Sequence, residues 1–198
     1  MNEVLNCEQN ERNSFVSVFG LLFLSILAAI SEIMSYKLLE YWNSRFYFSF
    51  SMVLCLISMI RWGAVGVVVA MIGGIPSILF SPMPLWSGIL FYILSNAFIG
   101  IPMMVYGSRN RNTIADGHVF LLLYIFFSHC SLSAGKGIVI FLLTGETTGV
   151  KDYFGATFFT MIINIIVCCV LQMRKGLICD MRYYFTYLEG EGNGSGRV

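Results

Sequence analysis

RWGAVGVVVAMIGGIPSILF, residues 61–80, is the stretch that decides the fold. Its only charge stands at its first position, and its length at about 1.5 Å per residue reaches across a hydrocarbon core of roughly 30 Å. Small residues recur four apart at Gly66, Ala70 and Gly74, and such a face lets another helix approach closely. We therefore predict a membrane-spanning helix that packs through this face, either within its own chain or against another subunit.

The composition is that of a membrane protein. Of 198 residues, 57% are hydrophobic and 12% are charged, and the mean hydropathy is +0.77. A soluble domain carries about 25% charged residues. The net charge of +1, without a long basic stretch, argues against a nucleic-acid partner. The six cysteines form no CxxC pair and lie mostly in or beside apolar runs, so we expect neither a disulfide nor a metal site.

Apolar runs predict an all-α integral membrane bundle of six transmembrane helices, over residues 15–175, between a polar segment at 1–14 and a polar tail at 176–198. The first run is too long for the core of a signal peptide, and no positive cluster precedes it. The second run is short, so we expect it to be steeply placed or buried in protein. The polar run 128–137 is expected to interrupt the fifth span. The spans are predicted at 15–36, 48–60, 61–80, 85–106, 118–143 and 154–173.

An even number of spans places both termini on the same side of the membrane. Basic residues are more frequent in the segments on that side, and cytoplasmic loops carry an excess of Lys and Arg. We therefore predict that both termini are cytoplasmic. The inner basic residues are Arg12, Arg61, Arg109, Arg111, Arg174, Lys175, Arg182 and Arg197, and the outer ones are Lys37, Arg45 and Lys151.

Motifs for the common membrane-associated chemistries are missing from the sequence. It contains no GxxxxGK[ST] phosphate loop, no HExxH and no GxSxG. It has two histidines, and its predicted spans hold few carboxylates, whereas an ion-coupled carrier usually shows paired acids. We therefore expect a protein that is not an enzyme and that needs no cofactor.

Isolated polar side chains at membrane depth are the candidate ligand contacts. A charge there costs about 2.5–3.5 kcal/mol on insertion scales, so it needs a partner or a function. Tyr92 and Asn96 lie four apart on one face of the fourth span, and His129 and Lys136 lie seven apart on one face of the fifth. Asn164 lies midway along the sixth span. The alternatives are hydrogen bonds between helices for the asparagines, a histidine bonded to a carbonyl, and a lysine that reaches the membrane surface.

The outer ends of the spans hold further candidates. Trp42 and Glu146, in predicted outer connections, are candidates for a lid over the site. Glu32, near the outer end of the first span, is either a solvated helix end or a ligand contact. Aromatic residues there form either a belt at the membrane surface or the lining of an outward pocket for a planar organic molecule. They are Trp42, Trp86, Tyr92 and Tyr153.

Three segments in order carry a family resemblance. SFSMV at 49–53 precedes RWGAVGVVVAMIGGI at 61–75, and LFYILSNAFIGI follows at 90–101. This order resembles the substrate-binding S components of energy-coupling factor (ECF) importers. Those proteins often show a serine-containing second span, a third span of the form (R/Y)(W/Y)GP..G...G...G and a fourth span like LDYxLAFxxxG. Tyr92 matches the tyrosine of the fourth-span motif, and Phe91 stands in place of its acid.

The resemblance implies a multi-pass protein of a bacterial or archaeal cell membrane that binds a vitamin or similar small organic nutrient from outside. A transmembrane coupling subunit and two cytoplasmic ATPase subunits would drive uptake. His129 stands where thiamin-binding members have a fifth-span histidine, and Asn164 where several members have a sixth-span asparagine. First spans in the family present a pair of small residues to the coupling subunit, for which Ser25 and Ala29 are the nearest match here. The small residues of the third span are the other coupling candidates: Gly66, Ala70 and Gly74.

Two other classes of function stay open at this point. A non-catalytic membrane scaffold of the MreD type, acting in cell shape or envelope assembly, has a similar span count and would hold no small molecule. An intramembrane enzyme or lone carrier would need several polar groups, one of them an acid, in one wet cavity. Glu32 and Glu146 are the carboxylates that could serve there.

Overall fold

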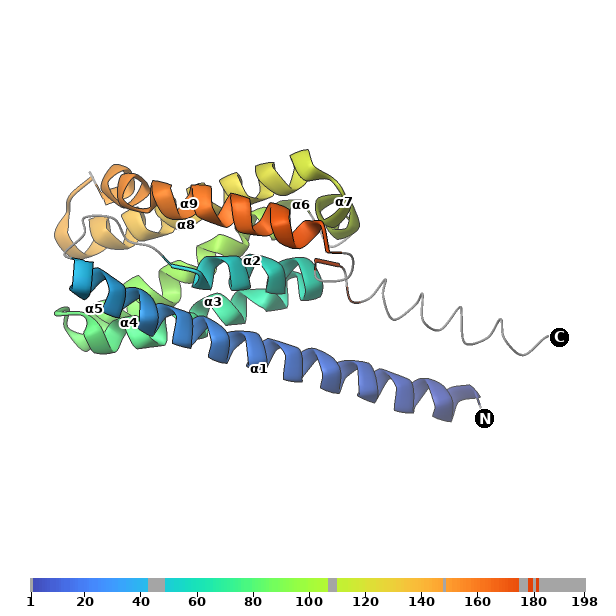
Figure 1. The fold of residues 1–198 in the computed structure, drawn as a ribbon. Helices are drawn as coiled ribbons and strands as arrows, with labels where there is room; N and C mark the ends of the chain where they lie inside the picture. Colours follow the sequence, from blue (N-terminus) through green and yellow to red (C-terminus); the bar gives the residue numbers. More distant parts are fainter. Residues whose placement is uncertain are drawn as a thin grey trace.

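The computed structural model describes residues 2–42, 49–106, 110–147, 149–174, 178–179 and 181, with the backbone alone for residues 2–14, 39–42 and 149. Every element in this part of the chain is helical, which confirms the all-α class (Figure 1). Most of the predicted tail, 176–198, lies outside the described residues. The elements are α1 (Asn2–Trp42), α2 (Ser51–Trp62), η1 (Gly63–Gly66), α3 (Val67–Gly73), α4 (Ile75–Phe80), α5 (Leu85–Gly88), the π-helical η2 (Ile89–Leu94), η3 (Ser95–Gly100), α6 (Ile101–Tyr106), α7 (Arg111–Asp116), α8 (His118–Thr144) and α9 (Gly149–Gln172).

Five helical stretches in the described chain are long and apolar enough to cross a membrane. One of them, Ser51–Phe80, folds back on itself. The five stretches are Phe15–Leu38, Ser51–Phe80, Leu85–Tyr106, His118–Thr144 and Val150–Gln172. Large apolar side chains remain exposed along their outer faces, as lipid contact requires. The bundle therefore has the six helical segments that the sequence predicts.

The folded stretch is a hairpin of α2 against η1, α3 and α4. Glu32 of α1 accepts hydrogen bonds from Ser51, at the start of α2, and from Ser77, in α4, so the chain must reverse between them. The reversal falls at Gly63, whose φ of 73° is one that residues with a side chain rarely adopt. At about 18 Å, α2 is too short to cross a membrane alone. Most of its side chains are buried, so of the two expected placements the structure shows the one in which the short second helix is buried in protein.

The small residues of the third span pack against other helices of the same chain. A Cβ added at Gly66 would lie 2.5 Å from the backbone nitrogen of Met59, in α2. A Cβ at Gly74 would lie 1.9 Å from the carbonyl oxygen of Tyr92, in η2. Ala70 is buried between these contacts. Of the two predicted uses of this face, the structure therefore contains the one within the chain.

The predicted interruption of the fifth span at 128–137 is wrong, because α8 runs through this segment as a continuous helix. The glycines there provide room for neighbouring side chains. A Cβ at Gly135 would lie 2.5 Å from the ring of Phe98, and one at Gly137 would lie 2.0 Å from a methyl group of Val150. Close packing on η3 and α9 thus explains these glycines without a break in the helix.

The start of α1 and the end of α9 lie towards the same end of the bundle (Figure 1). At this end Arg111 is 1% exposed, and its guanidinium donates a hydrogen bond of 3.2 Å to the carbonyl of Arg61, in the last turn of α2. A cation at the C-terminal end of a helix satisfies carbonyl groups that the helix leaves unpaired. The assignment of this end to the cytoplasm stays a prediction.

Candidate functional site

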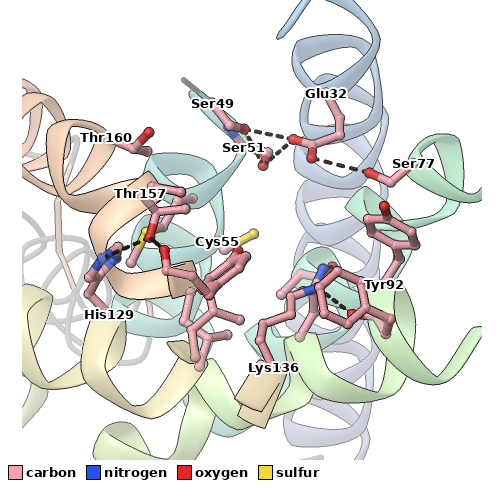
Figure 2. A pocket seen from close by; sticks show the side chains of 18 of the residues that line it. Glu32, Ser49, Ser51, Cys55, Ser77, Tyr92, His129, Lys136, Thr157 and Thr160 are labelled. Atoms are coloured by element: carbon pink, nitrogen blue, oxygen red, sulfur yellow. Dashed lines mark hydrogen bonds between the residues drawn. The ribbon is translucent and has the colours of Figure 1, made fainter. Parts of the chain in front are cut away.

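A cavity of about 260 Å³ lies inside the bundle, beside the last turns of α1 and the start of α2 (Figure 2). Side chains from α1, α2, α3, α4, η2, η3, α8 and α9 line it, so every spanning segment contributes. Ligand pockets commonly measure about 300–1,000 Å³. At about 260 Å³ the cavity lies just below this range, so its size suits a small organic molecule and not a drug-sized one.

A carboxylate surrounded by hydroxyl groups occupies one side of the cavity. Ser49 and Ser51 donate to Oε2 of Glu32 over 2.6 and 2.8 Å, and Ser77 donates to Oε1 over 3.2 Å. Figure 2 shows these serines pointing at the carboxylate from the two arms of the hairpin. Glu32 is only 9% exposed and α1 continues beyond it to Trp42. The interpretation of Glu32 as a solvated helix end is therefore wrong, and its position fits the alternative of ligand contact.

An ammonium group occupies another side. Lys136 is 3% exposed, so its chain does not extend to the membrane surface, and that alternative is wrong. Its Nζ donates to the carbonyl of Phe91 and lies 4.3 Å from the centre of the Phe91 ring. The rings of Tyr92 and Tyr153 follow at 5.1 and 5.8 Å. Aromatic faces within about 6 Å attract a cation, so this side of the cavity is built to hold a positive charge.

The π-helical turn of η2 supplies the carbonyl that Lys136 uses. The backbone N–H of Ser95 bonds to the carbonyl of Leu90, five residues back, instead of to that of Phe91. The Phe91 carbonyl accepts from the Ser95 hydroxyl and from Lys136. Turns of this kind are often found at functional sites.

His129 lines the cavity from α8 and is fixed by α9. Its Nε2 lies 3.1 Å from the Thr157 hydroxyl, which donates to the carbonyl of Tyr153 over 2.8 Å. A carbonyl can only accept, so Thr157 uses its single hydroxyl hydrogen on Tyr153. The hydrogen between Thr157 and His129 must therefore belong to Nε2 of His129. The ring packs edge-on against Phe154, with centroids 5.1 Å apart. Nδ1 is buried without a hydrogen-bond partner among the described residues.

The two predicted asparagines lie in different places. Asn96 lines the cavity and its Nδ2 donates to the Ala70 carbonyl over 3.0 Å, so it makes the expected hydrogen bond between helices, and its contact with a ligand stays a prediction. Asn164 is fully buried but does not belong to the cavity lining, and its amide group has no hydrogen-bond partner in the described part of the chain. The cavity thus brings Tyr92, Asn96, His129 and Lys136 together.

One of the two lid candidates, Glu146, is not part of the described lining. Glu146 is exposed beyond the end of α8, where its N–H bonds to the Thr144 hydroxyl over 3.2 Å. Trp42 ends α1, and its side chain lies outside the described side chains. Among the aromatic residues, Trp86 is 71% exposed, as a membrane-surface belt requires, whereas Tyr92 and Tyr153 line the cavity.

The coupling candidates are largely enclosed. Gly66, Ala70 and Gly74 are buried under α2 and η2, so in this conformation they are not available to a second protein. Ser25 is 3% exposed and donates to the carbonyl of Leu21. Ala29 is half-buried. A coupling role for these residues stays a prediction.

The hydroxyl groups of Ser49, Ser51, Ser77 and Thr157 line the cavity without having been predicted from the sequence. The serine-containing segment at 49–53 was the available signal, since it lies at the start of the short second helix. Among the described residues, no three His, Cys, Asp or Glu side chains come together as a metal site would need. Comparisons of the chain with protein-family models, with curated proteins and with solved structures find no match.

Proposed function

We propose that the chain is the membrane-embedded substrate-binding subunit of an importer that captures a small organic nutrient, such as a vitamin, from outside the cell. The observation that carries the proposal is the cavity, which holds a carboxylate and an ammonium group at membrane depth among aromatic side chains. Ionisable residues at this depth are expensive and usually mark a site of function. The bound molecule would lie between Glu32 and Lys136.

The neighbours of the two charged groups favour binding over a purely structural role. Hydroxyl groups surround the carboxylate, and a carbonyl and aromatic faces surround the ammonium. Every spanning segment contributes to this lining, although a bundle of this kind could pack with apolar side chains alone. A polar interior of this extent is costly for a scaffold and useful for a binding protein.

Energy for uptake must come from other chains under this proposal, because the sequence has no nucleotide-binding motif. We propose a transmembrane coupling subunit and two cytoplasmic ATPase subunits as the partners, in a bacterial or archaeal cell membrane. The basic end of the bundle, with Arg61 and Arg111, would face the cytoplasm and the cavity half would face outward.

Co-purification tests this function. The tagged chain is isolated from its own cells in mild detergent, beside another polytopic membrane protein of the same cells as a control. The proposal predicts that a pair of ATPases and a further membrane protein accompany the chain and not the control. Recovery of cell-envelope assembly proteins in place of ATPases would contradict it and support the scaffold alternative.

A further inference from the structure

We propose that the cavity selects a small zwitterion, a molecule with an anionic group for Lys136 and a protonated nitrogen for Glu32. This inference rests on the proposed binding function and names the chemistry of the bound molecule. It follows from the hydrogen-bonding capacity that each side of the cavity leaves to a ligand, and from the charge balance of the whole lining.

The ammonium side leaves donors to be satisfied. An ammonium group has three N–H donors, and Lys136 directs one of them to the Phe91 carbonyl. The described residues provide no second hydrogen-bond acceptor for it; the aromatic rings beside it attract its charge but replace a carboxylate poorly. A carboxylate or similar anion on the ligand would take the remaining donors. A cationic ligand would compete with Lys136 for the same rings.

The carboxylate side leaves acceptors. Ser49, Ser51 and Ser77 direct hydroxyl hydrogens at Glu32, and the Ser49 oxygen also accepts from the backbone N–H of Ser51 over 3.1 Å. With these hydrogens directed inward, acceptor lone pairs of the serine oxygens and of the carboxylate predominate on the surface that faces a ligand. Only a donor group complements such a surface. A protonated nitrogen does so best, because it also balances the carboxylate charge.

Charge balance selects against molecules that carry only one of the two groups. Glu32 and Lys136 are of opposite sign and line the same cavity, so the lining is close to neutral with His129 uncharged. A ligand with a net charge would leave that charge uncompensated inside a membrane protein, which is costly. A zwitterion leaves the filled cavity neutral. Its body would be planar or apolar, because aromatic side chains also line the cavity.

The experiment identifies what the purified full-length chain captures. The wild-type chain in nanodiscs is incubated with the ultrafiltered small-molecule fraction of a cell extract, washed and analysed by native mass spectrometry with fragmentation of the released molecule. A captured molecule with an anionic group and a basic nitrogen supports the inference. A captured molecule that lacks either group overturns the inference and leaves the proposed function standing. Capture of no molecule contradicts the proposed function itself.

Variants assign the two groups. Lys136→Met and Glu32→Gln should each lower the captured amount roughly tenfold or more, the size expected for the loss of a charge-assisted hydrogen bond. Lys151→Met and Asp116→Asn remove matching charges from exposed positions outside the cavity and should capture as much as wild type. Thermal unfolding of each variant checks that it is folded. Equal capture by the cavity variants and their controls would overturn the inference.

Discussion

Substitution of Gly74 by alanine tests the closest packing contact around the site. In the structure an added Cβ would lie 1.9 Å from the carbonyl oxygen of Tyr92. Carbon–oxygen contacts in proteins are about 3.3–3.6 Å even when a weak C–H···O interaction draws the atoms together. The backbone of η2 would therefore have to retreat by about 1.4 Å or more, and it carries the Phe91 carbonyl that holds Lys136. We expect the variant to lose stability and to disturb the cavity.

Overpacking of this kind typically costs about 1–3 kcal/mol, and a chain of this length loses about 2–4 °C in melting temperature per kcal/mol. The assay is scanning fluorimetry of the purified chain in detergent. Gly155→Ala is the matched control, because a Cβ there meets no described atom within 4 Å, and alanine stabilises a helix relative to glycine by about 0.5–1 kcal/mol. Gly74→Ala should melt several degrees below wild type, and Gly155→Ala should melt at or above it. Equal melting temperatures for the two variants would refute the packing described here.

Three further predictions concern the hairpin, the buried arginine and the orientation in the membrane. Gly63→Ala should lower the free energy of unfolding by about 1–3 kcal/mol, because the φ of 73° and ψ of −147° at Gly63 suit glycine alone. Gly145→Ala is the control and should lower it by less, because its φ of 76° and ψ of 1° lie in the left-handed helical region. The reverse order of the two melting temperatures would contradict the hairpin geometry. Arg111→Met should cost about 1–3 kcal/mol, since it leaves a carbonyl at the end of α2 unpaired, whereas Arg174→Met at an exposed position should leave the melting temperature unchanged. Glu146→Cys should react with a membrane-impermeant maleimide on intact cells, and Arg174→Cys only after permeabilisation; the opposite pattern would reverse the proposed orientation.

Helical periodicity was enough to predict the α8 and η2–η3 sides of the site. His129 and Lys136 are seven residues apart, and Tyr92 and Asn96 are four apart, so each pair shares a helix face whatever the tertiary structure. The inward direction of these faces was predictable too, because a polar residue at membrane depth points inward in almost any bundle, but whether inward residues meet in one cavity was not. Asn164 illustrates this limit. It faces the interior, but it lies one turn of α9, about 6 Å, beyond Thr160, the last described residue of α9 that lines the cavity.

The carboxylate side of the site could not be predicted from local patterns. Glu32 meets Ser49, Ser51 and Ser77, which are 17, 19 and 45 residues away in the sequence. Those contacts exist because the hairpin brings both its outer ends to α1, and the turn at Gly63 sets that geometry. Without the hairpin, a carboxylate near the end of an apolar run is indistinguishable from a solvated helix end.

The central claim is that the cavity inside the bundle holds one small molecule, and filling the cavity tests it most directly. Ala156 lines the cavity and its neighbour Gly155 faces open space on α9, so Ala156→Phe and Gly155→Phe place the same bulk inside and outside. Native mass spectra of both variants and of wild type are recorded after exposure to the small-molecule fraction of a cell extract. We predict one added small mass per chain for wild type and Gly155→Phe, and none for Ala156→Phe. An added mass that persists in Ala156→Phe, or that is missing from wild type, would contradict the claim.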